Sequence, residues 1–299
     1  MATIYAIEST AETPDLSTGD YPTVLSEVQH GELSRAVAVI DVLWYLEESY
    51  DVVLQNAVEL EVAVARIEAG QRANVSSFPD EVDLEIRLLN RLLINFLASA
   101  RAFVDSVKHR VSEAGELFAG KFAGFEALFR EQFDAEFSYR LMDALRNHSQ
   151  HRAAVIGQTL SIIRTWQSSK GESKQMLTVS PQIERDALVQ DKKVRGKTRE
   201  EIAQNCDVMI DLLPHLAVYV RCFGKIVDKA RLLFQSEYDA AVSTHMSLLK
   251  DHLADDWAAV WVTCSEGSKQ CETLVTGAYE LRRLERIRYR NAARDPESK

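Results

Sequence analysis

The sequence of 299 residues is poor in cysteine, proline and glycine, with four, six and twelve of each. Turn-rich β proteins use glycine and proline freely, so this scarcity favours a helical fold. The four cysteines form no CxxC pair and are too few for a disulfide framework in a chain of this length. We therefore expect reduced thiols and a cytoplasmic protein.

Long hydrophobic runs are also missing. The most apolar stretch, residues 88–98, is interrupted by Asn90, Arg91 and Asn95, whereas a membrane-spanning helix needs about 20 mostly apolar residues. Residues 1–16 lack the basic segment and the apolar segment of a signal peptide. We expect neither a membrane span nor an export signal.

The motifs of the common nucleotide-dependent and metal-dependent enzymes are absent. The chain has no GxxxxGK[ST], GxGxxG, HExxH or GxSxG segment and no Cys/His array at zinc spacing. The pair His245 and His252 and the pair Cys264 and Cys271 are each seven residues apart, but without nearby acidic ligands they are more typical of structural histidines and thiols. We expect no metal ion and no cofactor.

The charge balance is acidic, with 35 Lys and Arg against 45 Asp and Glu, a net charge of −10. Such a chain repels nucleic acid at long range, so any contact with RNA must be local. One region differs. Residues 144–171 contain no Asp or Glu but hold Arg146, Arg152, Arg164 and Lys170, which favours an anion-binding site there.

Hydrophobic periodicity predicts a mainly α fold built on an antiparallel helical bundle. Apolar residues recur at steps of three and four over residues 39–67 and 82–107, which indicates two long helices joined by a short loop. Their apolar stripes are wider than the seam of a coiled-coil homodimer, so each helix needs several neighbours. A row of phenylalanines over residues 118–137 predicts a third helix with an aromatic face, and residues 138–151 a shorter fourth.

After residue 153 the period shifts towards two. Two β-branched segments separated by a turn-like stretch predict a small β-hairpin. A helical pattern over residues 202–248 predicts a long C-terminal helix that is kinked or divided at Pro214 or Gly224. Residues 257–264 suit a strand or a helix, and the Arg-rich terminal run an amphipathic helix that frays at its end. We expect an irregular lead-in at 1–33, with room for a short strand at residues 3–7, the bundle at 34–152, the hairpin and a connector at 153–198, and a C-terminal helical region at 199–299.

The candidate site is the segment RNHSQH, residues 146–151. On a helix Asn147 and His151 are four residues apart and share a face, so the amide can orient the imidazole. Arg146 can offer two parallel N–H donors to a phosphate, and an imidazole with a pKa near neutrality can transfer a proton. These residues make a minimal phosphodiester site that needs no metal ion. His148 and Arg152 are expected beside it as RNA contacts.

This arrangement resembles the HEPN superfamily, helical domains of which many are metal-independent ribonucleases marked by an Arg and a His separated by four to six residues, often with a polar residue after the Arg. The resemblance covers about residues 34–152 and does not extend to the hairpin or beyond. It implies that Arg146, Asn147 and His151 are catalytic. It also implies cleavage of RNA by attack of the ribose 2′-hydroxyl, which leaves a 2′,3′-cyclic phosphate and a 5′-hydroxyl.

The resemblance further implies a homodimer, because members of the family commonly join two motifs across an interface and this chain has one. The implied biological role is phage defence or growth control, as in toxin–antitoxin systems, with a protein antitoxin or activator as partner. The alternative is a non-catalytic helical protein-interaction module, in which RNHSQH caps a helix and its cations complement the negative end of the helix dipole.

Overall fold

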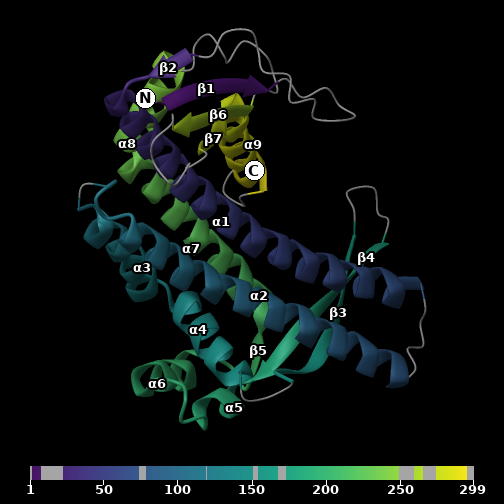
Figure 1. Ribbon diagram of the computed structural model, residues 1–299. Coiled ribbons are helices and arrows are strands. Elements are labelled where there is room, and N and C mark those ends of the chain that lie inside the picture. Colours follow the sequence, from purple (N-terminus) through teal and green to yellow (C-terminus); the bar gives the residue numbers. More distant parts are fainter. Residues whose placement is uncertain are drawn as a thin grey trace. The chain divides into compact units, whose positions relative to one another are not determined.

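The computed structural model describes residues 2–7, 23–73, 79–118, 120–150, 154–167, 173–248, 259–264 and 274–294. It is mainly helical with small antiparallel sheets, which confirms the predicted fold class (Figure 1). The chain divides into two compact units. Unit 1 comprises residues 1–48, 106–126 and 227–294, and unit 2 comprises residues 49–105, 127–226 and 295–299. Both units combine separate stretches of chain.

The first two helices are α1 (Glu27–Ala73) and α2 (Pro79–Glu113), and each contributes residues to both units. Helix α1 begins seven residues before the predicted Ser34 because Ser26 and Gln29 cap it reciprocally. The Gln29 side chain accepts a hydrogen bond from Ser26 N at 2.9 Å, and Ser26 Oγ accepts one from Gln29 N at 3.2 Å. This capping box satisfies two N–H groups at the helix start. Gly70, the predicted stop, lies within the helix.

In unit 2 the long helices pack with α3 (Phe122–Ala135), α4 (Phe137–Ser149) and α7 (Leu212–Leu233) around a cluster of aromatic rings. Phe103 is central to this cluster, because its ring centroid lies 5.3 Å from that of Phe223, 6.1 Å from Phe129 and 6.2 Å from Tyr50. Each such ring buries a large apolar area. Of the predicted aromatic row, Phe118, Phe125 and Phe129 are buried, whereas Phe122, Phe133 and Phe137, which opens α4, are partly exposed.

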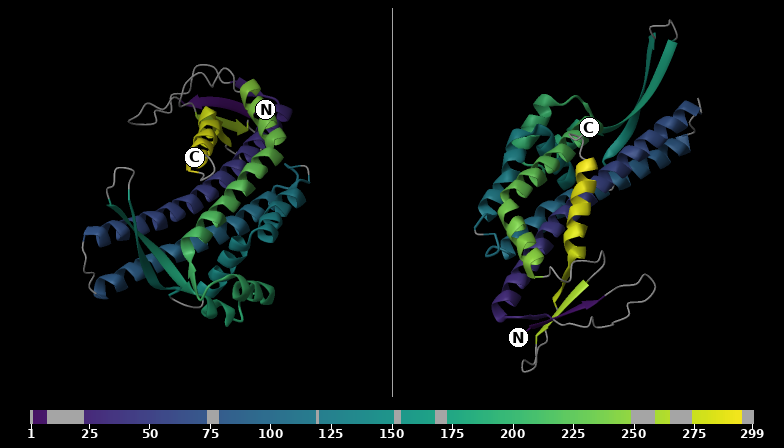
Figure 2. Two further views of the ribbon diagram at one scale, coloured as in Figure 1. Left: turned by 180° about the vertical axis from the view of Figure 1, so that it is seen from behind. Right: turned by 90° about the horizontal axis from the view of Figure 1, so that it is seen from above.

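The predicted β-hairpin is confirmed as β3 (Ile156–Gln167) and β4 (Ser173–Glu184), which are antiparallel. A short third strand, β5 (Met209–Asp211), pairs with β4 to complete the sheet of unit 2. Hydrogen bonds tie this sheet to the end of α1: Glu68 accepts from Val179 N at 2.9 Å, and Arg72 donates to Leu177 O at 2.8 Å. Figure 2 shows the ribbon of β3 and β4 beside the ends of α1 and α2 in two further views.

The predicted long helix over residues 202–248 is wrong. The structure has α5 (Arg185–Val189), α6 (Gly196–Asn205), β5, α7 and then α8 (Gln235–Leu248). The predicted break points lie inside α7. Pro214 occupies the first turn, where its missing N–H costs no hydrogen bond, and Gly224 continues the helix. The chain breaks instead at the extended residues around β5 and at Phe234, between α7 and α8.

Unit 1 contains an antiparallel sheet in the order β2-β1-β6-β7, formed by β1 (Ala2–Ile7), β2 (Thr23–Leu25), β6 (Ala259–Cys264) and β7 (Leu274–Gly277). Residues 259–264 are thus a strand. The Arg-rich run forms the predicted helix, α9 (Ala278–Arg294). Within the described ranges, no helix is both long enough and apolar enough to cross a membrane.

A buried ionic cluster joins α9 to the rest of unit 1. The Glu47 side chain is fully buried and accepts two hydrogen bonds of 2.8 Å from Arg231. Asn291, also fully buried, donates to Glu47 O at 2.9 Å and to Glu47 Oε2 at 3.1 Å. A buried carboxylate is tolerated only when it is paired in this way.

Candidate functional site

Helix α4 carries most of the segment singled out in the sequence. It starts after Glu136 and ends at Ser149, and it buries one face against the core of unit 2. That face consists of Ser138, Tyr139, Leu141, Met142, Ala144, Leu145 and His148. Arg146 and Asn147 lie in the last turn and are half-buried. Cations are favourable at this position because the C-terminal end of a helix has a negative partial charge.

Arg146 and Asn147 are in direct contact. The Arg146 guanidinium donates a hydrogen bond from Nη1 to Asn147 Oδ1 at 3.0 Å. The backbone oxygen of Arg146 accepts hydrogen bonds from Ser149 Oγ at 2.9 Å and Gln150 N at 3.3 Å. The amide of Asn147 therefore orients the guanidinium of Arg146, a role that the sequence had assigned to it with respect to His151.

Arg146 lines a cavity of about 320 Å³ between the end of α4 and helix α2, together with Ser149 and Gln150. Pockets for small ligands begin at about this size. Arg101 and Asp105 of α2 line the same cavity and form an ion pair of 2.7 Å with each other. Two guanidinium groups thus face one carboxylate, and the remaining wall is apolar, with Ile94, Leu97, Ala98 and Ala102. We call this cavity the α2–α4 groove.

His148 has a different place from the one expected. Its side chain is only 3 % exposed, and its Nδ1 lies 2.6 Å from Oδ2 of Asp191, in the loop between α5 and α6. The other carboxylate oxygen of Asp191 accepts a hydrogen bond from Lys193 N at 2.8 Å. In this conformation the His148 ring offers RNA no surface and instead fastens the end of α4 to that loop.

His151 and Arg152 lie outside the described residues. The described residues therefore bring together two of the three predicted catalytic groups, Arg146 and Asn147. Arg101 was missed by the sequence reasoning. Its i,i+4 pairing with Asp105 is visible in the sequence, but that spacing does not indicate that the pair faces α4.

A second polar pair lies at the other end of α4. Ser138 Oγ and His215 Nδ1 of α7 are hydrogen-bonded at 2.9 Å, and burial lowers the pKa of His215 below its ordinary value. Ser138 precedes Arg146 by eight residues, which corresponds to about 12 Å along a helix, so this pair is separate from the α2–α4 groove. Because His215 is half-buried and bonded to Ser138, we interpret the pair as a packing contact between α4 and α7.

The groove can bind an anion and neutralise charge that develops on it. Arg146 is preset by Asn147, so little side-chain freedom is lost when it binds a phosphate. Burial raises the pKa of Tyr139 and of Tyr219, so both phenols stay protonated near neutrality and neither is a base. Within the described part of the chain, no group of three or more His, Cys, Asp or Glu is placed to hold a metal ion.

Comparisons with protein-family models, with curated proteins and with solved structures gave no match for this chain.

Proposed function

We propose that this protein is a metal-independent endoribonuclease of the HEPN type, with its site at the end of α4. The observation that carries the proposal is the Arg146 guanidinium, which is oriented by Asn147 and lines the α2–α4 groove. A guanidinium held in this way is suited to a phosphate. His151 follows Arg146 by five residues and supplies the imidazole that the reaction requires.

The reaction proceeds by attack of a ribose 2′-oxygen on the adjacent phosphorus. The bond from the 2′-oxygen to phosphorus forms, and the bond from phosphorus to the 5′-oxygen breaks. A proton leaves the 2′-hydroxyl and a proton reaches the departing 5′-oxygen, so the products are a 2′,3′-cyclic phosphate and a 5′-hydroxyl. His151 transfers protons and Arg146 stabilises the charge on the phosphoryl oxygens. Arg152 adds a phosphate contact.

The reaction needs two proton transfers, and each chain has one His151. Two chains that place their motifs near a shared two-fold axis supply one imidazole for each transfer. We accordingly propose a homodimer, in which one imidazole acts as base and its symmetry mate as acid. The proposed setting is phage defence or growth control, with an antitoxin or an activator protein as partner.

The first test is the cleavage of a long RNA by purified protein in EDTA. His151→Ala and Arg146→Ala should each abolish most of the cleavage, and Arg146→Ala should slow it by about 100-fold to 1,000-fold, the usual effect of removing one donor to a developing oxyanion. Products should carry cyclic phosphate ends. Size-exclusion chromatography must show that both variants keep the oligomeric state of the wild type.

Matched control variants exclude non-specific effects. His109→Ala removes an imidazole that is 73 % exposed on α2 and pairs only at the surface with Glu113, and Arg91→Ala removes an exposed guanidinium of the same helix. Both should cleave as the wild type does. Equal cleavage by wild type, His151→Ala and Arg146→Ala would rule out the proposed site.

The alternative function is a helical interaction module. One observation favours it: Val58 and Val62, one turn apart on α1, are 45 % and 50 % exposed, and adjacent exposed valines suit a partner helix. The two functions differ in their prediction for RNA. A module that has no nuclease site leaves the RNA intact in every variant.

A further inference from the structure

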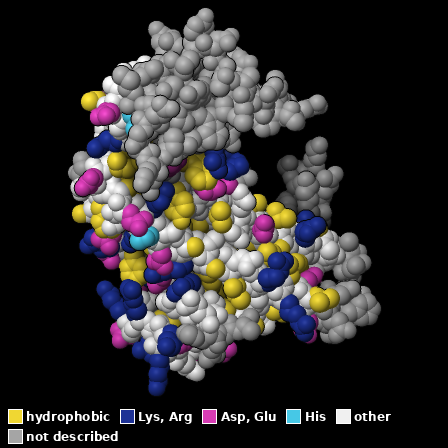
Figure 3. All heavy atoms as spheres, in the orientation of Figure 1, with side chains coloured by type: hydrophobic (Ala, Val, Ile, Leu, Met, Phe, Trp, Pro, Cys, Tyr) yellow, Lys and Arg dark blue, Asp and Glu magenta, His cyan; other side chains and the backbone are white. Residues whose placement is uncertain are grey.

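The loop between α5 and α6 and the first turn of α6 form a basic surface that the proposed site does not use. Residues 190–199, QDKKVRGKTR, contain five Lys and Arg against one Asp, a net charge of +4 in a chain of −10. Lys192, Lys193, Arg195 and Lys197 are exposed. Figure 3 shows Lys and Arg side chains gathered over α6 and its neighbourhood. We call residues 190–199 the basic loop.

The one acidic residue of the basic loop does not weaken its surface charge. Asp191 is turned inward, with 12 % of its side chain exposed, and it is paired with His148 and with Lys193 N. Of the two glutamates that follow the loop, Glu201 forms an ion pair with Arg140 and Glu200 is exposed. The outer face of the basic loop is therefore cationic, because its own carboxylate is committed to the interior.

Val194 and Arg195 anchor the basic loop further. Val194 is 2 % exposed and its N–H donates to Asp191 O at 3.1 Å. The Arg195 guanidinium lies over the Phe133 ring, with its carbon 5.3 Å from the ring centroid, a favourable cation–π arrangement. A surface that is ordered before binding loses less entropy when a ligand binds.

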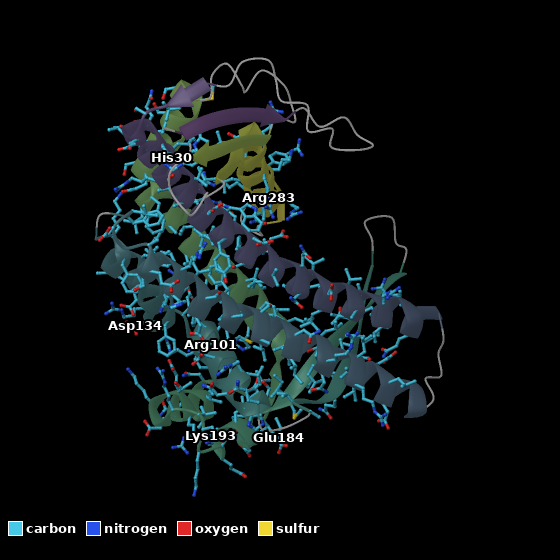
Figure 4. The ribbon with its side chains drawn as sticks, in the orientation of Figure 1. His30, Arg101, Asp134, Glu184, Lys193 and Arg283 are labelled. Atoms are coloured by element: carbon cyan, nitrogen blue, oxygen red, sulfur yellow. The ribbon has the colours of Figure 1, made fainter. Side chains whose placement is uncertain are left out.

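The basic loop adjoins the end of α4. His148, which contacts Asp191, follows Arg146 by two residues and precedes His151 by three. Helix α4 also packs against α5 and α6. In Figure 4, Lys193 is labelled below α6, and Arg101, which lines the α2–α4 groove, on α2. The groove and the basic loop thus both contact the last turn of α4, through Arg146 and His148 respectively.

We infer that the basic loop binds the phosphate backbone of RNA next to the scissile linkage. This inference rests on the proposed function. The groove and the basic loop both contact the end of α4, so one polyanion can bind to both, whereas a lipid surface would need exposed apolar side chains in the loop. The apolar residue of the loop, Val194, is buried.

The test measures binding separately from cleavage. Fluorescence anisotropy in EDTA, with a 2′-O-methyl RNA that cannot undergo 2′-hydroxyl attack, compares wild type with Lys192→Ala/Lys193→Ala. Loss of two phosphate contacts should weaken binding roughly tenfold near physiological salt and reduce the slope of log K against log salt by about 1.4. The control, Arg66→Ala/Arg91→Ala, removes two exposed cations of α1 and α2 in the same unit and should bind as the wild type does.

A dinucleotide substrate tests for a structural effect. It spans only the scissile linkage, so kcat and KM for its cleavage should be the same in wild type and Lys192→Ala/Lys193→Ala, while KM for a long RNA rises. Unchanged RNA binding and salt slope in Lys192→Ala/Lys193→Ala would overturn the inference. An equal loss of RNA binding in the control Arg66→Ala/Arg91→Ala would also overturn it, as would tighter binding of the loop to anionic vesicles or acidic peptides than to RNA. Absence of cleavage with intact, loop-dependent RNA binding would overturn the proposed nuclease and leave the RNA-binding surface.

Discussion

Asn90 of α2 holds the start of β3, shortly after the site, through a complete set of hydrogen bonds. Its Oδ1 accepts from Val155 N at 2.6 Å and from Ile156 N at 2.9 Å, and its Nδ2 donates to Ile156 O at 2.9 Å and to Ile86 O at 3.0 Å. Asn90 is 4 % exposed. The chain is thus fixed four residues after His151, and Asn90→Ala should release it.

The expected cost of Asn90→Ala follows from the groups that it leaves unpaired. Val155 and Ile156 are buried, at 8 % and 1 % exposure, so two N–H groups lose their acceptor where water has little access. Each such group costs about 1–3 kcal/mol. For two such groups we predict a loss of about 3 kcal/mol in the free energy of unfolding, or about 6–12 °C in Tm for a unit of this size.

Asn56→Ala is the matched control. Asn56 also donates from Nδ2 to the backbone oxygen four residues earlier, Val52 O, at 2.9 Å, but it bonds no other segment in the hydrogen bonds described here. This substitution removes the local contribution alone and should cost less than about 1 kcal/mol. Urea unfolding followed by circular dichroism measures both variants. If Asn90→Ala is no less stable than Asn56→Ala, the reasoning about the orphaned N–H groups is refuted.

Three further outcomes test the packing and the buried charges. Phe103→Ala should lower the free energy of unfolding by about 3–5 kcal/mol, because it empties the centre of the aromatic cluster of unit 2; a loss below 1 kcal/mol in urea unfolding would contradict this. Glu47→Gln leaves the Arg231 guanidinium without its buried carboxylate and should cost about 3 kcal/mol in thermal unfolding; an unchanged Tm would argue against a stabilising ion pair. Burial lowers the pKa of His245 below 6.5, so the unfolded chain binds a proton before the folded one as the pH falls. The contribution of His245 to the free energy of unfolding should be fully present above about pH 6.5 and should fall below that pH by at most about 1.4 kcal/mol per pH unit. Between about pH 7 and pH 5.5 the free energy of unfolding of His245→Leu should fall less than that of the wild type. Equal slopes for the two proteins would exclude this histidine as the cause.

Local patterns in the sequence were sufficient for most of the helices and for the hairpin. The three-and-four spacing of apolar residues marked α1, α2 and α4, because each of these helices buries one continuous face. The same signal failed over residues 202–248. Ile202 of α6, Val220 of α7 and Ala241 of α8 are all buried, so together they imitate one helical seam although they belong to separate elements.

Strand β5 shows why that failure could not be avoided. It consists of three residues and exists because Gln182, Ile183 and Glu184 of β4 pair with it. The paired residues Ile183 and Ile210 are 27 residues apart in the sequence. Local β propensity therefore could not predict this strand. The capping box of Ser26 and Gln29, in contrast, involves residues close in sequence and could have been predicted. It was overlooked because Pro22 and Gly31 on either side of it favoured an irregular segment.

In the candidate site, too, only contacts between residues close in sequence could be predicted. Arg146 and Asn147 are neighbours, so their contact depends only on α4. The partner of His148 is Asp191, 43 residues away, and Arg101 reaches the groove from α2, 45 residues before Arg146. Both contacts depend on how α4 packs against distant segments of the chain, which the sequence does not show. The same packing buries His148.

In the proposed reaction, a 2′-hydroxyl attacks a phosphate held by Arg146 without a metal ion. The most direct measurement uses a DNA oligonucleotide that contains a single ribonucleotide, incubated in EDTA with wild type or Arg146→Ala under single-turnover conditions. We expect one cut by the wild type, on the 3′ side of the ribonucleotide, with a 2′,3′-cyclic phosphate end and a rate at least about 100-fold lower in the variant. Cleavage of the all-deoxy oligonucleotide, or equal rates in the two proteins, would contradict it.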